Sequence, residues 1–259
     1  MKSTLHKKFI ILVLAATLLT SALFMSACDR TKNDNPYKND NNFVVRTVDT
    51  SEALEFHPID FTPKYGVIFY IGALIAPERY AYLGEALAKQ GYLVVIPKLE
   101  GNNAFNSYTL NEAAFYKYPS VKFFVGGHDL GGGAAVRRTM ECSKYVKGVF
   151  LYAPTGFRKQ LYNADGSMVL DDDGNPVWQH FTTEDLPNPT LLLETDDVLR
   201  TAELKQEAAA HINGTQTSLH TLEASVSSDF STYSATEILN PQRSETIMLT
   251  LAFLKSIVV

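Results

Sequence analysis

The most constraining feature of this sequence is a buried-strand pattern that runs directly into a glycine-rich turn and then into a helix of small residues. The stretch from Val121 to Arg137 reads VKFFVGGHDLGGGAAVR. An apolar run of this kind is typical of a central strand covered on both faces. The glycines at 127 and 131 flank Asp129 two residues away on each side, where side chains would clash in a sharp turn. The pattern predicts a strained strand-to-helix turn that lifts the Asp129 side chain above a sheet, beside the positive end of a helix dipole.

The rest of the chain alternates between strand-like and helix-like segments. Strands are expected at 43–48, 53–56, 66–71, 92–96, 121–125, 146–152, 190–193 and 218–222, and helices at 77–90, 109–117, 131–143, 201–211 and 241–257. Repeated strand–helix–strand units predict an α/β domain with a mostly parallel, doubly wound sheet and helices on both faces. The rhythm breaks at 154–189, where turn signals at 164–166 and 173–176 flank an alternating stretch. We expect a β-hairpin insertion there, before the next strand of the sheet.

Several motifs, taken in order, resemble the α/β-hydrolase superfamily over nearly all of residues 43–257, and small bacterial members related to dienelactone hydrolase in particular. GVIFYIGA at 66–73 is similar to the first central strand and its oxyanion turn, and PKLEGNNAF at 97–105 is similar to a conserved turn of these proteins. GGHDLGG at 126–132 is similar to the Gly-Gly-His-Ser-Leu-Gly-Gly nucleophile elbow. The resemblance implies an α/β-hydrolase fold and a Ser–His–Asp triad.

The triad positions depart from that pattern. Asp129 stands where the family has its nucleophilic Ser, and Ser227 stands where it has His. The acid falls on Asp197, with Asp196 as the alternative. The mature chain has five histidines: His57, His128, His180, His211 and His220. We expect each of them to have a structural or surface role. His180, in the insertion, is the first candidate to reach the site as a base.

Three functions remain open for this constellation. If the backbone N–H groups of Ala73 and Leu130 form an oxyanion hole, the Asp129 carboxylate would sit against them and block the site, which indicates a non-catalytic binding or structural protein. Alternatively, Asp129 is itself the nucleophile of an ester, haloalkane or epoxide hydrolase, which would still need a base to release the covalent ester. A third reading is a cation site formed by Asp129 and Asp197, with Ca²⁺ as the candidate. No cofactor is expected, and a small-molecule ligand is the candidate partner in the pocket.

The N-terminal segment predicts export and lipidation. Lys2, Lys7 and Lys8 precede an uncharged apolar run from 9 to 25, and small residues stand before Cys28. This layout is typical of a signal peptide over 1–27, and MSAC at 25–28 resembles a bacterial lipobox whose Cys is lipidated; an uncleaved membrane anchor is the alternative. We therefore expect a lipoprotein held on the outer face of the bacterial cytoplasmic membrane, with a flexible polar tether at 28–42 and one domain at 43–259.

Charge and cysteine content narrow the partners further. After removal of 1–27, 20 Lys and Arg face 28 Asp and Glu, a net charge of −8, and no basic stripe is present. Nucleic acid is therefore not expected as a partner. Lipidation of Cys28 would leave Cys142 alone, so the domain must depend on its core rather than on a disulfide.

Overall fold

The computed structural model describes residues 35–104, 112–196, 216–223, 225, 227–232 and 241–258. Its centre is an eight-stranded sheet in the order β1-β2-β4-β3-β5-β6-β9-β10. The strands are β1 (Val45–Asp49), β2 (Ala53–Pro58), β3 (Tyr65–Tyr70), β4 (Leu93–Pro97), β5 (Lys122–His128), β6 (Val146–Tyr152), β9 (Thr190–Thr195) and β10 (Thr217–Leu222). The pairs from β4 to β10 are parallel, and β2 pairs antiparallel with both β1 and β4. The nearly continuous apolar runs of the central strands are buried, as strands covered on both faces require.

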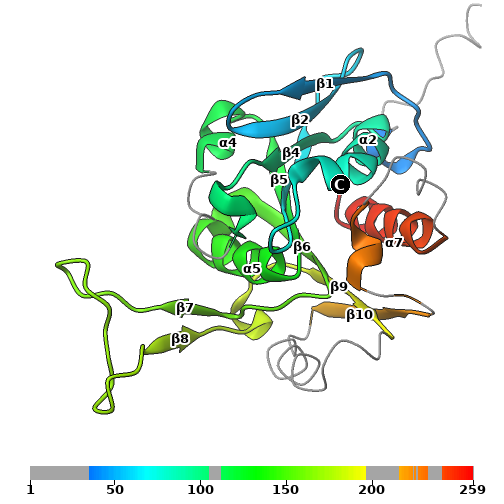
Figure 1. Cartoon of the computed structure of the whole chain (residues 1–259). Coiled ribbons are helices and arrows are strands. Elements are labelled where there is room, and N and C mark those ends of the chain that lie inside the picture. Colours follow the sequence, from blue (N-terminus) through cyan, green and yellow to red (C-terminus); the bar gives the residue numbers. More distant parts are fainter. Residues whose placement is uncertain are drawn as a thin grey trace, which may run out of the picture.

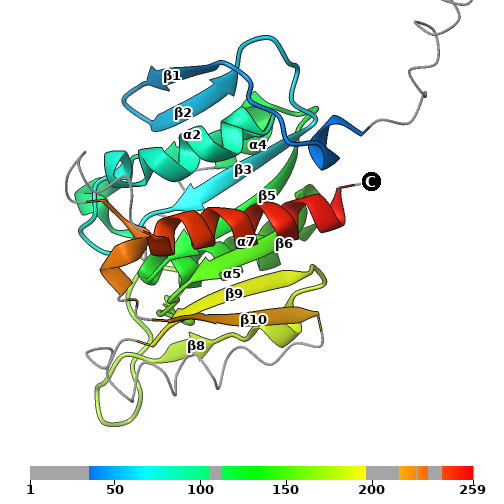
Figure 2. The same cartoon turned by 90° about the vertical axis from the view of Figure 1, so that its right-hand side faces the viewer.

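Helices cover both faces of this sheet. In the view of Figure 2, α2 (Ala81–Lys89) and α7 (Pro241–Ile257) lie in front of the sheet, while α4 (Glu112–Lys117) and α5 (Leu130–Cys142) lie behind it. The short 3₁₀ turns are η1 (Pro36–Lys38), η2 (Pro77–Tyr80), η3 (Glu100–Asn102), η5 (Ser143–Tyr145), η6 (Thr183–Asp185) and η7 (Ser227–Phe230). The predicted α/β-hydrolase fold with its doubly wound, mostly parallel sheet is confirmed. The helix expected at 201–211 lies outside the described residues.

The insertion also forms where its turn signals predict it, as an arm that leaves the body between β6 and β9 (Figure 1). Its base is a two-stranded antiparallel ribbon of β7 (Arg158–Gln160) and β8 (Trp178–His180). Beyond this ribbon the chain makes two further turns, held by isolated bridges between Tyr162 and Met168 and between Leu170 and Pro176. The arm is therefore more elaborate than the single hairpin expected.

The boundary of the domain differs from the expected one. Residues 35–42 were expected in the flexible tether, but Tyr37 is 1% exposed and packs against the rings of Phe61, Tyr65 and Tyr92. Its hydroxyl accepts hydrogen bonds from the backbone N–H groups of Lys64, at 2.6 Å, and Tyr65, at 3.2 Å. The expectation was wrong for this stretch, because one aromatic residue in a polar segment is enough to dock it on the core.

Within the described residues, no helix has both the length and the apolar character needed to cross a membrane. The apolar run at 9–25 and Cys28 lie outside the described part of the chain.

Candidate functional site

The site begins at the turn from β5 into α5, where Asp129 has φ 51° and ψ −124°. A non-glycine residue in this region is strained, and the strain is tolerated because the surrounding contacts fix the turn. A Cβ atom on Gly127 would lie 2.1 Å from the carbonyl oxygen of Gly131, and one on Gly131 would lie 2.3 Å from that of Tyr70. Both glycines are required by close backbone approach, so the turn has the geometry of a nucleophile elbow with a carboxylate at its apex.

The Asp129 carboxylate is held by two donors from neighbouring strand ends. One oxygen, Oδ2, accepts a hydrogen bond from the Ala73 N–H at 3.2 Å, and Oδ1 accepts one from the Thr155 hydroxyl at 2.7 Å. Thr155 is 6% exposed, and its own N–H donates to the carbonyl oxygen of Asp129 at 3.0 Å. The loop after β6 thus holds both the backbone and the side chain of the elbow residue.

The turn that carries Ala73 is itself fixed by a second loop. The next residue, Leu74, has φ 59°, and its N–H donates to the carbonyl oxygen of Asn102 at 2.9 Å. Asn102 has φ 50°. The backbone N–H of Ala73 is therefore aimed by two left-handed residues that brace each other, which is how an oxyanion turn is preorganised. Leu130 is the first residue of α5, so its N–H is one of the groups at the helix start that lack an intrahelical acceptor.

Two of the residues singled out in the sequence meet directly beside the elbow. His128 is 2% exposed, and its Nε2 lies 2.9 Å from Oγ of Ser227. On the other side of the ring, Nδ1 lies 2.8 Å from the hydroxyl of Tyr80, which also accepts the N–H of Gly72 at 2.9 Å. The buried His128 thus connects Tyr80 to Ser227, the residue expected at the family histidine position.

The acid positions are only partly described. Asp196 follows β9, and its Oδ1 accepts the backbone N–H of Ser225 at 2.8 Å. This bond ties the acid loop to the loop that carries Ser227. Asp197, the preferred acid position, lies outside the described residues.

The remaining histidines occupy other places. The Nε2 of His57 lies 3.0 Å from a carboxylate oxygen of Glu55 on β2. His180 is exposed at the end of β8, and His220 is exposed on β10. His211 lies outside the described residues. None of the described members of this set is brought to Asp129 by a hydrogen bond.

Two residues of this site were not anticipated from the sequence, Thr155 and Tyr80. Thr155 follows the carboxyl end of β6, beside the elbow strand, and carboxyl ends of adjacent parallel strands meet at one edge of a sheet. That position was a usable signal. Tyr80 falls within the helix expected at 77–90, and its bond to His128 spans 48 residues of sequence, which no local pattern reveals.

The described residues contain no group of three or more His, Cys, Asp or Glu side chains suited to hold a metal ion. A cavity of about 660 Å³ lies between η2, α2 and α7, and its lining residues do not include Asp129. The described part of the chain therefore supplies no further ligand for a cation bound by Asp129 and Asp197.

Comparisons with known proteins identify the family and the fold. No curated protein sequence matches the chain. Among solved structures, a predicted CIB-like hydrolase from Thermoplasma acidophilum is similar in fold, with a TM-score of 0.53 and 16% sequence identity, over 82% of this chain and 98% of that one. A family model described as "Alpha/beta hydrolase family" matches residues 66–238, which is more than half of the chain. The protein with the Asp129 elbow therefore belongs to the alpha/beta hydrolase family.

Proposed function

We propose that this protein is a lipid-anchored, extracytoplasmic member of the family whose elbow binds a ligand and does not hydrolyse it. One observation carries the proposal: the Asp129 carboxylate takes the hydrogen bond of the Ala73 N–H, the donor that an oxyanion turn offers to a substrate oxygen. A substrate carbonyl can use this donor only after Asp129 gives it up.

Charge adds to this obstruction. A developing oxyanion placed about 4 Å from the Asp129 carboxylate would be repelled by roughly 1–4 kcal/mol at surface-like dielectric values. An activation barrier raised by about 2–3 kcal/mol would remove most of the acceleration that an oxyanion hole supplies. The same charge favours ligands that donate hydrogen bonds or carry a positive charge.

The missing base points in the same direction. Ser227 holds the family histidine position, and a hydroxyl is not a general base near neutral pH. Its Oγ lies 2.9 Å from the Nε2 of His128, so that histidine nitrogen is already engaged. Among the residues that the structure describes, no group is therefore positioned to activate water against an ester formed on Asp129.

A second candidate function is hydrolysis with Asp129 as the nucleophile, and the strained elbow geometry at φ 51° favours it. The experiment that separates the two functions compares the fragment from Asp29 onward with its Asp129→Ala variant on activated short-chain esters, haloalkanes and epoxides. Binding without chemistry predicts that both proteins are silent while the same compounds, or their cationic analogues, raise the melting temperature of the wild type. Turnover that is lost in the variant would overturn the proposal, and so would a complete absence of ligand-induced shifts across a broad library.

Lipid anchoring rests on the signal-like segment and on Cys28, now combined with the position of the first packed residues. Because the domain begins as early as Asn35, residues 29–34 would span at most about 20 Å. The proposed anchor would thus hold the domain close to the membrane surface. Replacement of Cys28 by Ser should abolish incorporation of a radiolabelled fatty acid into the protein, and a variant that incorporates as much label as the wild type would contradict lipidation at this residue.

A further inference from the structure

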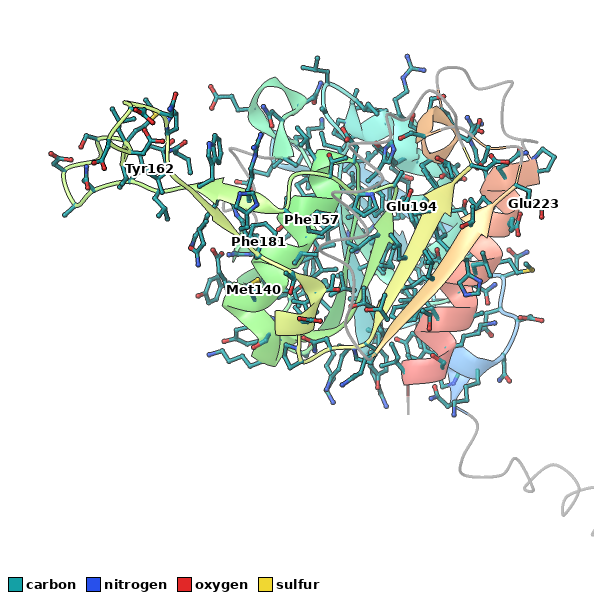
Figure 3. All side chains as sticks on the ribbon, turned by 90° about the horizontal axis from the view of Figure 1, so that it is seen from below. Met140, Phe157, Tyr162, Phe181, Glu194 and Glu223 are labelled. Atoms are coloured by element: carbon teal, nitrogen blue, oxygen red, sulfur yellow. The ribbon has the colours of Figure 1, made fainter. Side chains whose placement is uncertain are left out.

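The arm at residues 158–180 has no counterpart in the chemistry discussed so far. It projects beyond the body of the domain, and Figure 1 shows it leaving on the side of α5. Only its root is buried: Phe157 is 0% and Phe181 is 4% exposed, with ring centroids 6.2 Å apart. Figure 3 shows these two rings where the arm joins the body, and Tyr162 far out along the arm.

A closed set of backbone hydrogen bonds stabilises the outer part of the arm without help from a core. The N–H of Leu161 donates to the carbonyl of Val177, that of Val177 to the carbonyl of Val169, and that of Val169 to the carbonyl of Leu161, at 3.1, 2.9 and 3.0 Å. These three hydrogen bonds close a ring between three chain segments, and the residues that form it are equally spaced along the sequence. The arm is a hydrogen-bonded platform and not a loose loop.

The two turns that complete the platform are built alike. Asn163 N–H donates to the carbonyl of Ser167, and Asp171 N–H donates to that of Asn175, at 2.8 and 2.9 Å. Gly166 and Gly174 occupy the same place in each turn, with φ of 84° and 81°. The repeated geometry shows that both turns are specified by the sequence.

The register of the platform places its exposed large hydrophobic side chains on one face, opposite the half-buried Leu161, Val169 and Val177. Tyr162 is paired with Met168, Leu170 with Pro176, and Gln160 with Trp178. Directly paired residues share a face, and so do residues two apart on one strand, so all six lie on the same side. Tyr162 is 61%, Met168 51% and Leu170 52% exposed, and the Arg158 guanidinium lies over the Trp178 ring at 4.6 Å. We call the surface formed by the six paired residues, with Arg158 over Trp178, the apolar face of the arm.

Carboxylates lie at the two outer turns of this face, while Arg158 and Lys159 lie at its base. The turns carry Asp165, Asp171, Asp172 and Asp173, all exposed, and no Lys or Arg occurs between Leu161 and Val177. Hydrogen bonds from Ser167 lower the pKa of Asp165, and the backbone N–H of Asn175 lowers that of Asp171, so both are charged at neutral pH. An apolar centre with a charged rim is the usual anatomy of a protein interface, and Tyr, Trp, Met and Arg are the side chains enriched there.

We propose that the apolar face of the arm is a docking site for a partner protein whose own surface has an apolar patch ringed by Lys and Arg. The charge selects this occupant. A second copy of the chain would bring a rim of the same sign, while an anionic membrane or a nucleic acid would be repelled. This proposal is independent of the function assigned to Asp129.

Site-specific photocrosslinking tests it with the full chain in the cells that produce it. Benzoylphenylalanine at position 162 is the probe, and the same residue at position 116 is the matched control, because Tyr116 is 72% exposed on α4, away from the arm. The expected result is one protein crosslinked from position 162 and not from position 116. The crosslinked protein is then purified and titrated against wild type, Leu170→Ser and Asp165→Lys/Asp172→Lys.

The proposal predicts that each variant weakens binding at least about tenfold, and that rising salt weakens wild-type binding but has less effect on the charge-reversed variant. The arm contributes little to the core, so all variants should keep the melting temperature of the wild type, which separates lost docking from lost folding. Crosslinks to lipid, to a second copy or to nothing would overturn the proposal. A captured protein whose affinity does not respond to Leu170→Ser or to the charge reversal would overturn it as well.

Discussion

The Glu55 cluster gives a prediction whose size follows from the structure. Glu55 is 4% exposed on β2, and its carboxylate accepts hydrogen bonds from Lys117 at 2.8 Å and Tyr118 at 2.7 Å, with His57 Nε2 at 3.0 Å. Burial raises the pKa of this carboxyl, but the bonds from His57, Lys117 and Tyr118 outweigh burial and lower the pKa to about 2, from an ordinary 4.5. The charged form is therefore favoured by folding, and this single group links β2 to α4.

The lowered pKa sets the pH window in which this contribution is lost. A group whose folded pKa lies below its unfolded pKa stabilises the fold above the unfolded value, and the stabilisation fades as pH falls through the folded one. A pKa lowered from 4.5 to about 2 corresponds to about 3 kcal/mol of stability, which should disappear between about pH 5 and pH 2. Glu55→Gln should remove this component of the pH dependence and cost about 2–3 kcal/mol at pH 7.

Urea unfolding at a series of pH values, followed by circular dichroism, measures the difference between wild type and variant. Glu52→Gln is the matched control, because Glu52 is an exposed carboxylate in the turn that precedes β2. The reasoning is refuted if the free energies of wild type and Glu55→Gln differ by a constant amount from pH 7 to pH 2.5. It is also refuted if the control flattens the profile as much as the Glu55 variant does.

Three further changes test the packing of the site and the domain boundary. Tyr37→Ala should destabilise the domain by about 3–5 kcal/mol, because it removes a buried ring and leaves two backbone N–H groups without their acceptor; chemical unfolding of the fragment from Asp29 measures this, and a cost under about 1 kcal/mol would return residues 35–42 to the tether. Gly131→Ala should lower the yield of folded protein, since its Cβ would lie 2.3 Å from a backbone oxygen of Tyr70, and a melting temperature equal to that of the wild type would refute the close approach. Thr155→Val keeps the volume but removes the hydroxyl donor to Asp129, so it should cost about 1–2 kcal/mol in thermal unfolding, and an unchanged stability would show that this bond contributes nothing.

The fold was predictable from the sequence because its signals are local and repeated. The run at 66–71 marked β3, and the glycine turn at 127–131 marked the start of α5. The ends of elements were less accurate: β5 was expected to stop at Val125, yet it continues to His128, because Gly126 and Gly127 keep their register with β3 and β6. Glycines give no apolar signal, and only the neighbouring strands show that the ladder goes on.

The site was predictable to the extent that it follows the family pattern. The positions of Asp129, Ala73 and Ser227 followed from motif order, but the partners that define their environment did not. The contact of Ser227 with His128 joins residues 99 apart in the sequence, and the hydrogen bond from the Lys64 N–H to the Tyr37 hydroxyl joins residues 27 apart. Such pairs depend on how the layers pack, which no periodicity encodes.

The most direct test of the central claim is the intact mass of the fragment from Asp29 after incubation with haloalkanes and epoxides. If Asp129 attacked an sp³ carbon, the ester would accumulate, because the described residues place no base to release it, and the trapped adduct would be visible without any turnover. The account predicts an unchanged mass for the folded wild type and for Asp129→Asn alike. A stoichiometric gain in mass that maps to the peptide containing Asp129, and is absent from Asp129→Asn, would contradict it.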